Sequence, residues 1–195
     1  MKTSDGAREE KAIVQDDFNK IPNDWFRDGK YVLYTRGPDL WFATLPELKS
    51  RLLLKAPSIF KNGQFSPNGK WVAYASNETG KWEIYVTSFP EPRGKWQVSV
   101  GGGEQPRWRG DGKELFYLSS DSKMMAAPVT TGANFDNGKP MELFQITPRQ
   151  PVSTNDQFVY DVSRDGQRFL VLTRVKVAEA APITVILNWP AKLNQ

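Results

Sequence analysis

The sequence predicts an all-β fold built from about four repeated antiparallel sheets, and two observations lead to this prediction. A ten-residue string recurs four times in 195 residues: an apolar residue, two spacers, Asp or Asn, Gly, Lys or Gln, then alternating apolar residues. The glycines of the four copies are 40, 43 and 54 residues apart, and a period in this range indicates a repeat architecture. They are Gly29, Gly69, Gly112 and Gly166.

Each copy predicts a β-hairpin, because Asp-Gly or Asn-Gly between alternating apolar residues is a strong hairpin signal. The glycine takes a positive φ without steric cost, and the Asp or Asn side chain caps nearby backbone N–H groups. The four glycines are therefore expected to be structural turn residues. Third strands are expected at 39–45, 83–89, 123–129 and 183–189, and fourth strands at 51–54, 96–100 and 141–146.

Four short antiparallel strands at this period describe a blade of a β-propeller. We therefore expect a propeller, or a propeller fragment, of about four four-stranded blades over residues 10–195, after a disordered tail at 1–9. The blades are expected at about 17–54, 59–100, 104–146 and 157–189.

The phase of the repeat raises the question of closure. Residues 10–15 resemble an outer strand, and the last blade lacks one, so pairing of 10–15 with 183–189 would close a ring and remove exposed edges. The alternative is an open arc from a larger propeller, with exposed end blades that would tend to dimerise or aggregate.

The composition argues against several kinds of chemistry. The chain has no His and no Cys, which excludes Ser-His-Asp and Cys-His nucleophiles and thiolate metal sites. Ser66 and Ser163 beside the turns are expected to bond turn backbone. The triple glycine at 101–103 is expected to form a tight turn between blades, because it lacks the Lys-Ser/Thr ending of a phosphate loop.

No metal or other cofactor is expected, because no calcium-loop spacing is present. The recurring acidic residues lie in the hairpin turns and indicate scaffold, although a carboxylate pair, as in a glycosidase, stays open. Aromatic residues fall on alternating strand positions and a net charge of +4 is dispersed, so nucleic-acid binding is not expected. Neither a signal peptide nor a membrane-spanning run of about 20 apolar residues is visible, so no direct membrane contact is expected from this chain.

A protein or peptide partner is expected at a disc face or channel mouth, where loops from every blade converge. The face opposite the Asp-Gly turns carries the other loops. Four residues on the first strands of their blades are candidates for binding: Asp24, Gln105, Arg107 and Tyr160.

Several segments carry a family resemblance, namely "NKIPNDWFRDGKYVLYTRGPDLW", "GGGEQPRWRGDGKELFYLSSDSKMMAAPV", "YDVSRDGQRFLVLT" and "PITVILNW". The chain resembles TolB-type, WD-like propeller repeats. It is most similar to the C-terminal propeller of bacterial membrane-anchored serine/threonine protein kinases. The kinase catalytic loop needs a histidine, and neither that loop nor the glycine-rich ATP loop is present. Arg27 and Arg164 also depart from the Ser or Pro usual in such turns.

The resemblance implies a non-catalytic sensor or protein-interaction module in the periplasmic or extracytoplasmic part of a signalling protein. The alternative is the regulatory propeller of a prolyl-oligopeptidase-type hydrolase whose catalytic domain lies elsewhere. A propeller that itself hydrolyses glycans or lactones is a third class, and it would need convergent carboxylates or a bound ion in the channel.

Overall fold

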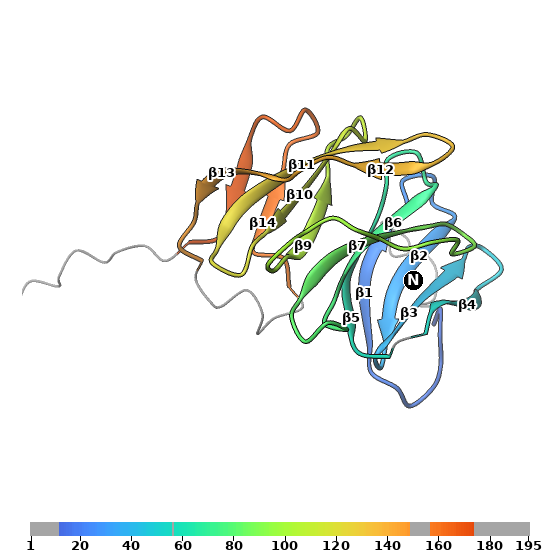
Figure 1. Ribbon diagram of the computed structural model, residues 1–195. Coiled ribbons are helices and arrows are strands. Elements are labelled where there is room, and N and C mark those ends of the chain that lie inside the picture. The colour runs from blue at the N-terminus through green and yellow to red at the C-terminus, as the bar shows by residue number, and fades with distance from the viewer. Residues whose placement is uncertain (1–11, 56, 149–156, 174–195) are drawn as a thin grey trace, which may run out of the picture.

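The computed structural model describes residues 12–55, 57–148 and 157–173. These residues form four antiparallel sheets that follow one another in chain order, with blade 1 at one end of the array and blade 4 at the other (Figure 1). The all-β propeller architecture predicted from the sequence is confirmed.

The first two blades each have four strands in sequential order, β1-β2-β3-β4 and β5-β6-β7-β8. Blade 1 contains β1 (Lys20–Trp25), β2 (Tyr31–Arg36), β3 (Asp39–Thr44) and β4 (Lys49–Leu54). Blade 2 contains β5 (Phe60–Phe65), β6 (Trp71–Ser76), β7 (Glu83–Ser88) and β8 (Trp96–Gln97).

The third blade has an additional short strand, and the described part of the fourth has two strands. Blade 3 contains β9 (Glu104–Trp108), β10 (Glu114–Leu118), β11 (Lys123–Thr131), β12 (Phe135–Asn137) and β13 (Met141–Gln145). Blade 4 contains β14 (Tyr160–Val162) and β15 (Phe169–Val171). The strand β12 was not expected; it pairs with the far end of β11 and brings Phe135 into the core.

The four turn glycines lie between the first and second strands of their blades, with φ of 78°, 68°, 72° and 74°. In every turn the Asp or Asn before the glycine accepts a hydrogen bond from the backbone N–H two residues further on, at 2.8–3.0 Å. The same local chemistry is therefore repeated in each blade.

The blades pack face to face through three apolar clusters, one at each junction. The cluster between blades 1 and 2 includes Leu33, Phe42, Phe65 and Tyr74. The cluster between blades 2 and 3 includes Trp71, Ala73, Leu115 and Tyr117, and the cluster between blades 3 and 4 includes Phe116, Leu118, Val162 and Phe169.

Some expectations fall outside the described residues. These are the third strand of blade 4 at 183–189, the disordered tail at 1–9, and the pairing of 10–15 with 183–189. Residues 12–15 are described, and they are not in a strand.

Candidate binding site on the first strands

One polar side chain per blade recurs five residues before the turn glycine. We call these residues the inner polar row: Asp24, Gln64, Arg107 and Asp161. They lie on β1, β5, β9 and β14, the first strands of the four blades. β5 lies against both β1 and β9, and a hydrogen bond joins Tyr160 of β14 to Gln105 of β9, so the row crosses all the blade junctions.

Hydrogen bonds and one ion pair connect the row from blade to blade. The Asp24 carboxylate accepts from the backbone N–H of Phe65 at 2.9 Å, and the Gln64 side-chain amide donates to the Asn23 carbonyl at 3.1 Å. Gln64 in turn accepts from the guanidinium of Arg107 at 2.9 Å. The Nε of Arg107 lies 3.5 Å from a carboxylate oxygen of Asp161, which completes the connection to blade 4.

Burial sets the electrostatics of the blade-1 end of this row. Desolvation raises the pKa of Asp24, while the backbone N–H groups of Phe65 and Trp25 and the positive charge of Arg107 oppose that rise. Asp24 is thus a partly buried acceptor that holds β1 to β5. Its carboxylate is already engaged by the protein itself.

Gln105 and Tyr160 likewise serve the junction between blades 3 and 4. The Gln105 side chain accepts from the Val159 N–H at 2.8 Å and donates to the Gln157 carbonyl at 3.0 Å. The Tyr160 hydroxyl donates to the Gln105 carbonyl at 2.8 Å, and burial raises the pKa of this phenol. Both side chains are buried, and Tyr160 also forms part of the wall of a cavity beside Arg107.

Arg107, like Asp24, is partly exposed. Its guanidinium lies 3.7 Å from the centroid of the Phe158 ring, and its side chain is 24% exposed. Stacking on an aromatic ring, the hydrogen bond to Gln64 and the ion pair with Asp161 restrict the orientation of the guanidinium. A guanidinium has five N–H donors, and these interactions do not use all of them. The remaining Arg107 donors can bind an acceptor on a ligand.

A cavity of about 350 Å³ lies beside Arg107, and we call it the inner-strand pocket. Its walls are mostly apolar, with Arg107 and Asp161 as the charged members. It is lined by Arg107, Phe158, Val159, Tyr160, Asp161, Leu170, Val171 and Leu172. Apolar walls with a few fixed polar groups are typical of a binding pocket. The sequence identified Arg107 and Tyr160, but it gave no signal for Phe158 or the β15 residues.

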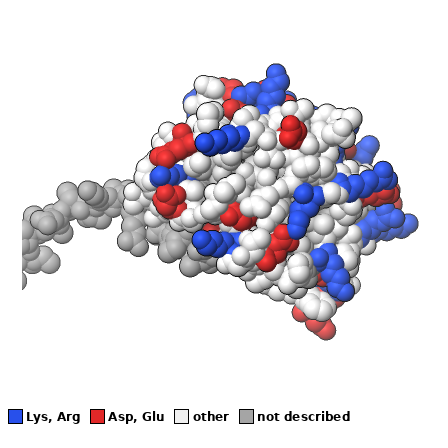
Figure 2. Space-filling model, viewed as in Figure 1, with Lys and Arg blue, Asp and Glu red and all other residues white. Residues whose placement is uncertain are grey.

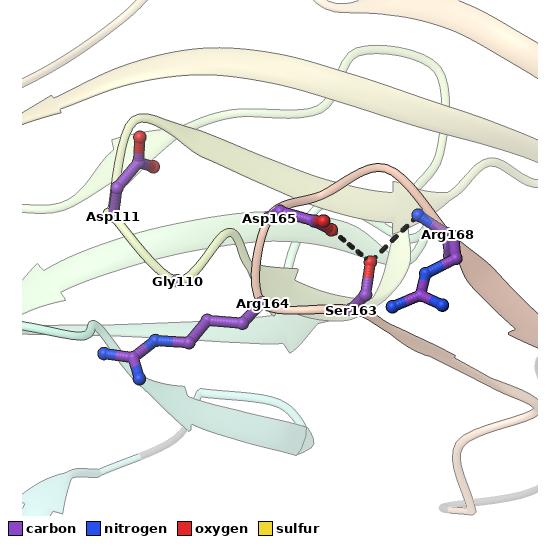
Figure 3. Close-up of a pocket in the computed structure, with 6 residues that line it drawn as sticks. All are labelled: Gly110, Asp111, Ser163, Arg164, Asp165 and Arg168. Carbon is purple, nitrogen blue, oxygen red and sulfur yellow. Dashed lines mark hydrogen bonds between the residues drawn. The ribbon is translucent and has the colours of Figure 1, made fainter.

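A second hollow, of about 480 Å³, lies between the turns of blades 3 and 4 (Figure 3). Its acidic groups are already bound: Arg109 holds Asp111 at 2.7 Å and lowers its pKa, and the Ser163 hydroxyl donates to Asp165 at 2.5 Å and lowers its pKa. Ser163 also accepts from the Arg168 N–H at 2.9 Å (Figure 3). Ser66 makes the equivalent bonds in blade 2, so both serines bond turn groups as expected.

Charges of both signs are interspersed over the face of the molecule that Figure 2 shows. Within residues 12–55, 57–148 and 157–173, no group of three or more carboxylates is placed to hold a metal ion. Nor does the described part of the chain contain a helix long and apolar enough to cross a membrane.

The repeated sheets, their turns and the row on their first strands define a β-propeller domain. Among solved structures, the chain is similar to TolB from Acinetobacter baumannii, with 19% identity over 89% of this chain and a TM-score of 0.65. A putative TolB from Agrobacterium tumefaciens is 15% identical over 67% of this chain, with a TM-score of 0.52. A putative 6-phosphogluconolactonase from Bacteroides uniformis is 16% identical over 77% of this chain, also with a TM-score of 0.52.

These similarities establish a TolB-like propeller fold. The chain spans 42% of the Acinetobacter protein, 52% of the Agrobacterium protein and 46% of the Bacteroides protein, which is about half of each. No family model matches the sequence, and no curated protein matches it.

Proposed function

We propose that this propeller is a non-catalytic interaction module that binds a protein or peptide segment at the inner-strand pocket. The observation that carries the proposal is the preorganised Arg107, stacked on Phe158 and bonded to Gln64 beside an apolar cavity. An apolar peptide side chain would enter the cavity, and a neighbouring peptide carbonyl or carboxylate would accept from Arg107. Fixed donors reduce the ordering that binding requires, which favours affinity.

The proposal extends to a sensor role in the extracytoplasmic part of a signalling protein. The support for this part is the sequence resemblance to propellers of membrane-anchored kinases, together with the TolB-like fold. The catalytic hypotheses have less support, because the Ser66 and Ser163 hydroxyls bond turn groups and the partly buried Asp24 carboxylate accepts from the Phe65 N–H.

Selection from a displayed library of random peptides tests the binding proposal. Peptides enriched on the purified chain should bind Arg107→Ala and Phe158→Ala at least about tenfold more weakly, since each tenfold is about 1.4 kcal/mol. Arg51→Ala, which removes an exposed arginine from β4, is the matched control and should bind normally. Equal binding to all variants, or no enriched peptide, would contradict the proposed site.

The same preparation should not turn over peptide, ester or ATP substrates. Turnover that follows the protein peak through successive columns would contradict the non-catalytic part of the proposal.

A further inference from the structure

Each end blade has one exposed face. The equivalent face of every other blade is covered by a neighbouring blade. Four residues after each turn glycine, the side chain packs towards the following blade. In blades 1 to 3 this residue is Leu33, Ala73 or Phe116, each at most 2% exposed. In blade 4 it is Leu170, which is 78% exposed.

A second position shows the same contrast. Six residues after the turn glycine, Ala75 of blade 2 and Leu118 of blade 3 are fully buried in their junction clusters. The equivalent Leu172, just after β15, is 52% exposed. Leu170 and Leu172 therefore form a face of blade 4, here called the leading face. The equivalent residues Leu33, Ala73, Phe116, Ala75 and Leu118 are all buried in junction clusters.

Blade 1 carries the complementary feature. Four residues before the turn glycine, Phe65, Trp108 and Val162 belong to the clusters against the preceding blade. The equivalent Trp25 is 55% exposed. We call the surface around Trp25 the trailing face.

The internal junctions show how the two faces would fit. The residue four before the glycine of one blade shares a cluster with the residue four after the glycine of the preceding blade. The pairs are Phe65 with Leu33, Trp108 with Ala73, and Val162 with Phe116. Among residues 12–55, 57–148 and 157–173, Trp25 and Leu170 are the members left without such a pairing, and both are large apolar residues exposed to solvent.

We propose that a second copy of this chain supplies the missing pairing, with the Trp25 face of one molecule packed on the Leu170 face of the other. Within one molecule the two faces lie at opposite ends of the array (Figure 1). A contact between two different surfaces is heterologous: it closes a ring if the rotation allows and otherwise extends the array. The occupant is a second copy because this chain carries both halves of the repeat contact. The inference does not depend on peptide binding, although Leu170 and Leu172 also line the inner-strand pocket.

Sedimentation equilibrium of the full chain over about a hundredfold range of concentration tests the proposal, because mass action then shifts the association. The wild-type mass should rise reversibly above the 22.1 kDa of one chain. Trp25→Asp and Leu170→Asp should each stay monomeric, because each destroys one of the two surfaces that a junction needs. Val100→Asp is the matched control, because Val100 is 84% exposed but not in a junction cluster.

Mixing the two variants separates this geometry from others. Leu170→Asp keeps an intact trailing face and Trp25→Asp an intact leading face, so an equimolar mixture should regain the mass of a dimer with one junction. If circular dichroism shows that Leu170→Asp is misfolded, Leu172→Asp takes its place, because it changes the same face and should also stay monomeric. A wild-type chain that stays monomeric throughout, or a mixture that fails to associate, would overturn the proposal.

Discussion

At the residue scale, the hairpin turns are set by local chemistry and were predictable. A positive φ, a side-chain acceptor before the glycine and the following alternation all depend on residues next to one another. The first strands were less predictable, because the register with the second strand shifts in blades 1, 2 and 3. At this bulge Asn62 and Gln105 adopt φ of 54° and 58°. A bulge interrupts the alternation, so the sequence could not show that Gln105 points into the junction while Arg107 reaches the surface.

Substitutions at two of the turn glycines distinguish the cost of backbone strain from the cost of a steric clash. A Cβ at Gly29 would meet no atom within 4 Å, whereas a Cβ at Gly69 would lie 2.5 Å from the Phe26 ring. Gly29→Ala should therefore lower the free energy of unfolding by about 1 kcal/mol, through the left-handed backbone alone. Gly69→Ala should lower it by about 2–4 kcal/mol, because the ring must also move.

Chemical denaturation of the two variants measures this order. Gly132→Ala is the control, because Gly132 has ordinary φ and an open environment, and its effect should stay within about 0.5 kcal/mol. Equal losses at Gly29 and Gly69 would show that Phe26 relaxes freely.

At the element scale, blade 2 is completed by side chains as well as by strand pairing. Its fourth strand, β8, has two residues. Beyond β8, the buried Ser99 hydroxyl accepts from the Ile84 N–H at 2.7 Å and donates to the buried Glu83 carboxylate. Glu83 also accepts from the Gly102 N–H at 2.9 Å. The triple glycine thus forms the expected turn between blades. Within it, the Gly102 N–H donates to the carboxylate of Glu83. The sequence could not identify Glu83 as that partner, since the two residues are brought together by the sheet.

Ser99→Ala should lower the free energy of unfolding by about 2–3 kcal/mol. The substitution leaves the Ile84 N–H and one Glu83 oxygen buried without this partner, and an unpaired buried group costs about 1–3 kcal/mol. Ser50→Ala, at an exposed position of β4, should change it by less than about 0.5 kcal/mol. Thermal or urea unfolding monitored by circular dichroism gives both values. Equally small losses for Ser99→Ala and Ser50→Ala would show that the pairing of β8 alone stabilises this part of blade 2.

At the scale of the whole molecule, the repeat period predicted the number and order of the sheets, because each blade repeats the same apolar pattern. The polar links between blades were not predictable, since they join strands about 40 residues apart that meet only after the blades have packed. The clearest link is a buried ion pair between blades 2 and 3. Lys61 lies 2.5 Å from Glu104, both side chains are less than 9% exposed, and the ammonium lies 3.9 Å from the Trp82 ring centroid.

Removing only the lysine of this pair should destabilise the junction in a pH-dependent way. Burial raises the pKa of Glu104 and Lys61 opposes that rise, so Lys61→Met should leave a buried carboxylate with a still higher pKa. At pH 7 the loss should be about 3–5 kcal/mol, as for other broken buried pairs. The folded variant then binds a proton more tightly than the unfolded chain, so its loss relative to wild type should shrink as pH falls from 7 towards 5.

The double variant Lys61→Met with Glu104→Leu removes both charges, so its stability should lie within about 1–2 kcal/mol of wild type and lack this pH dependence. Arg93→Met breaks the pair of Arg93 with Glu91, whose side chains are 82% and 74% exposed, and should change stability by less than about 1 kcal/mol. Urea unfolding at several pH values distinguishes these cases. If Lys61→Met loses the same stability at every pH, the loss comes from the packing of Lys61 against Trp82. Lys61 would then not stabilise the fold by compensating the charge of Glu104.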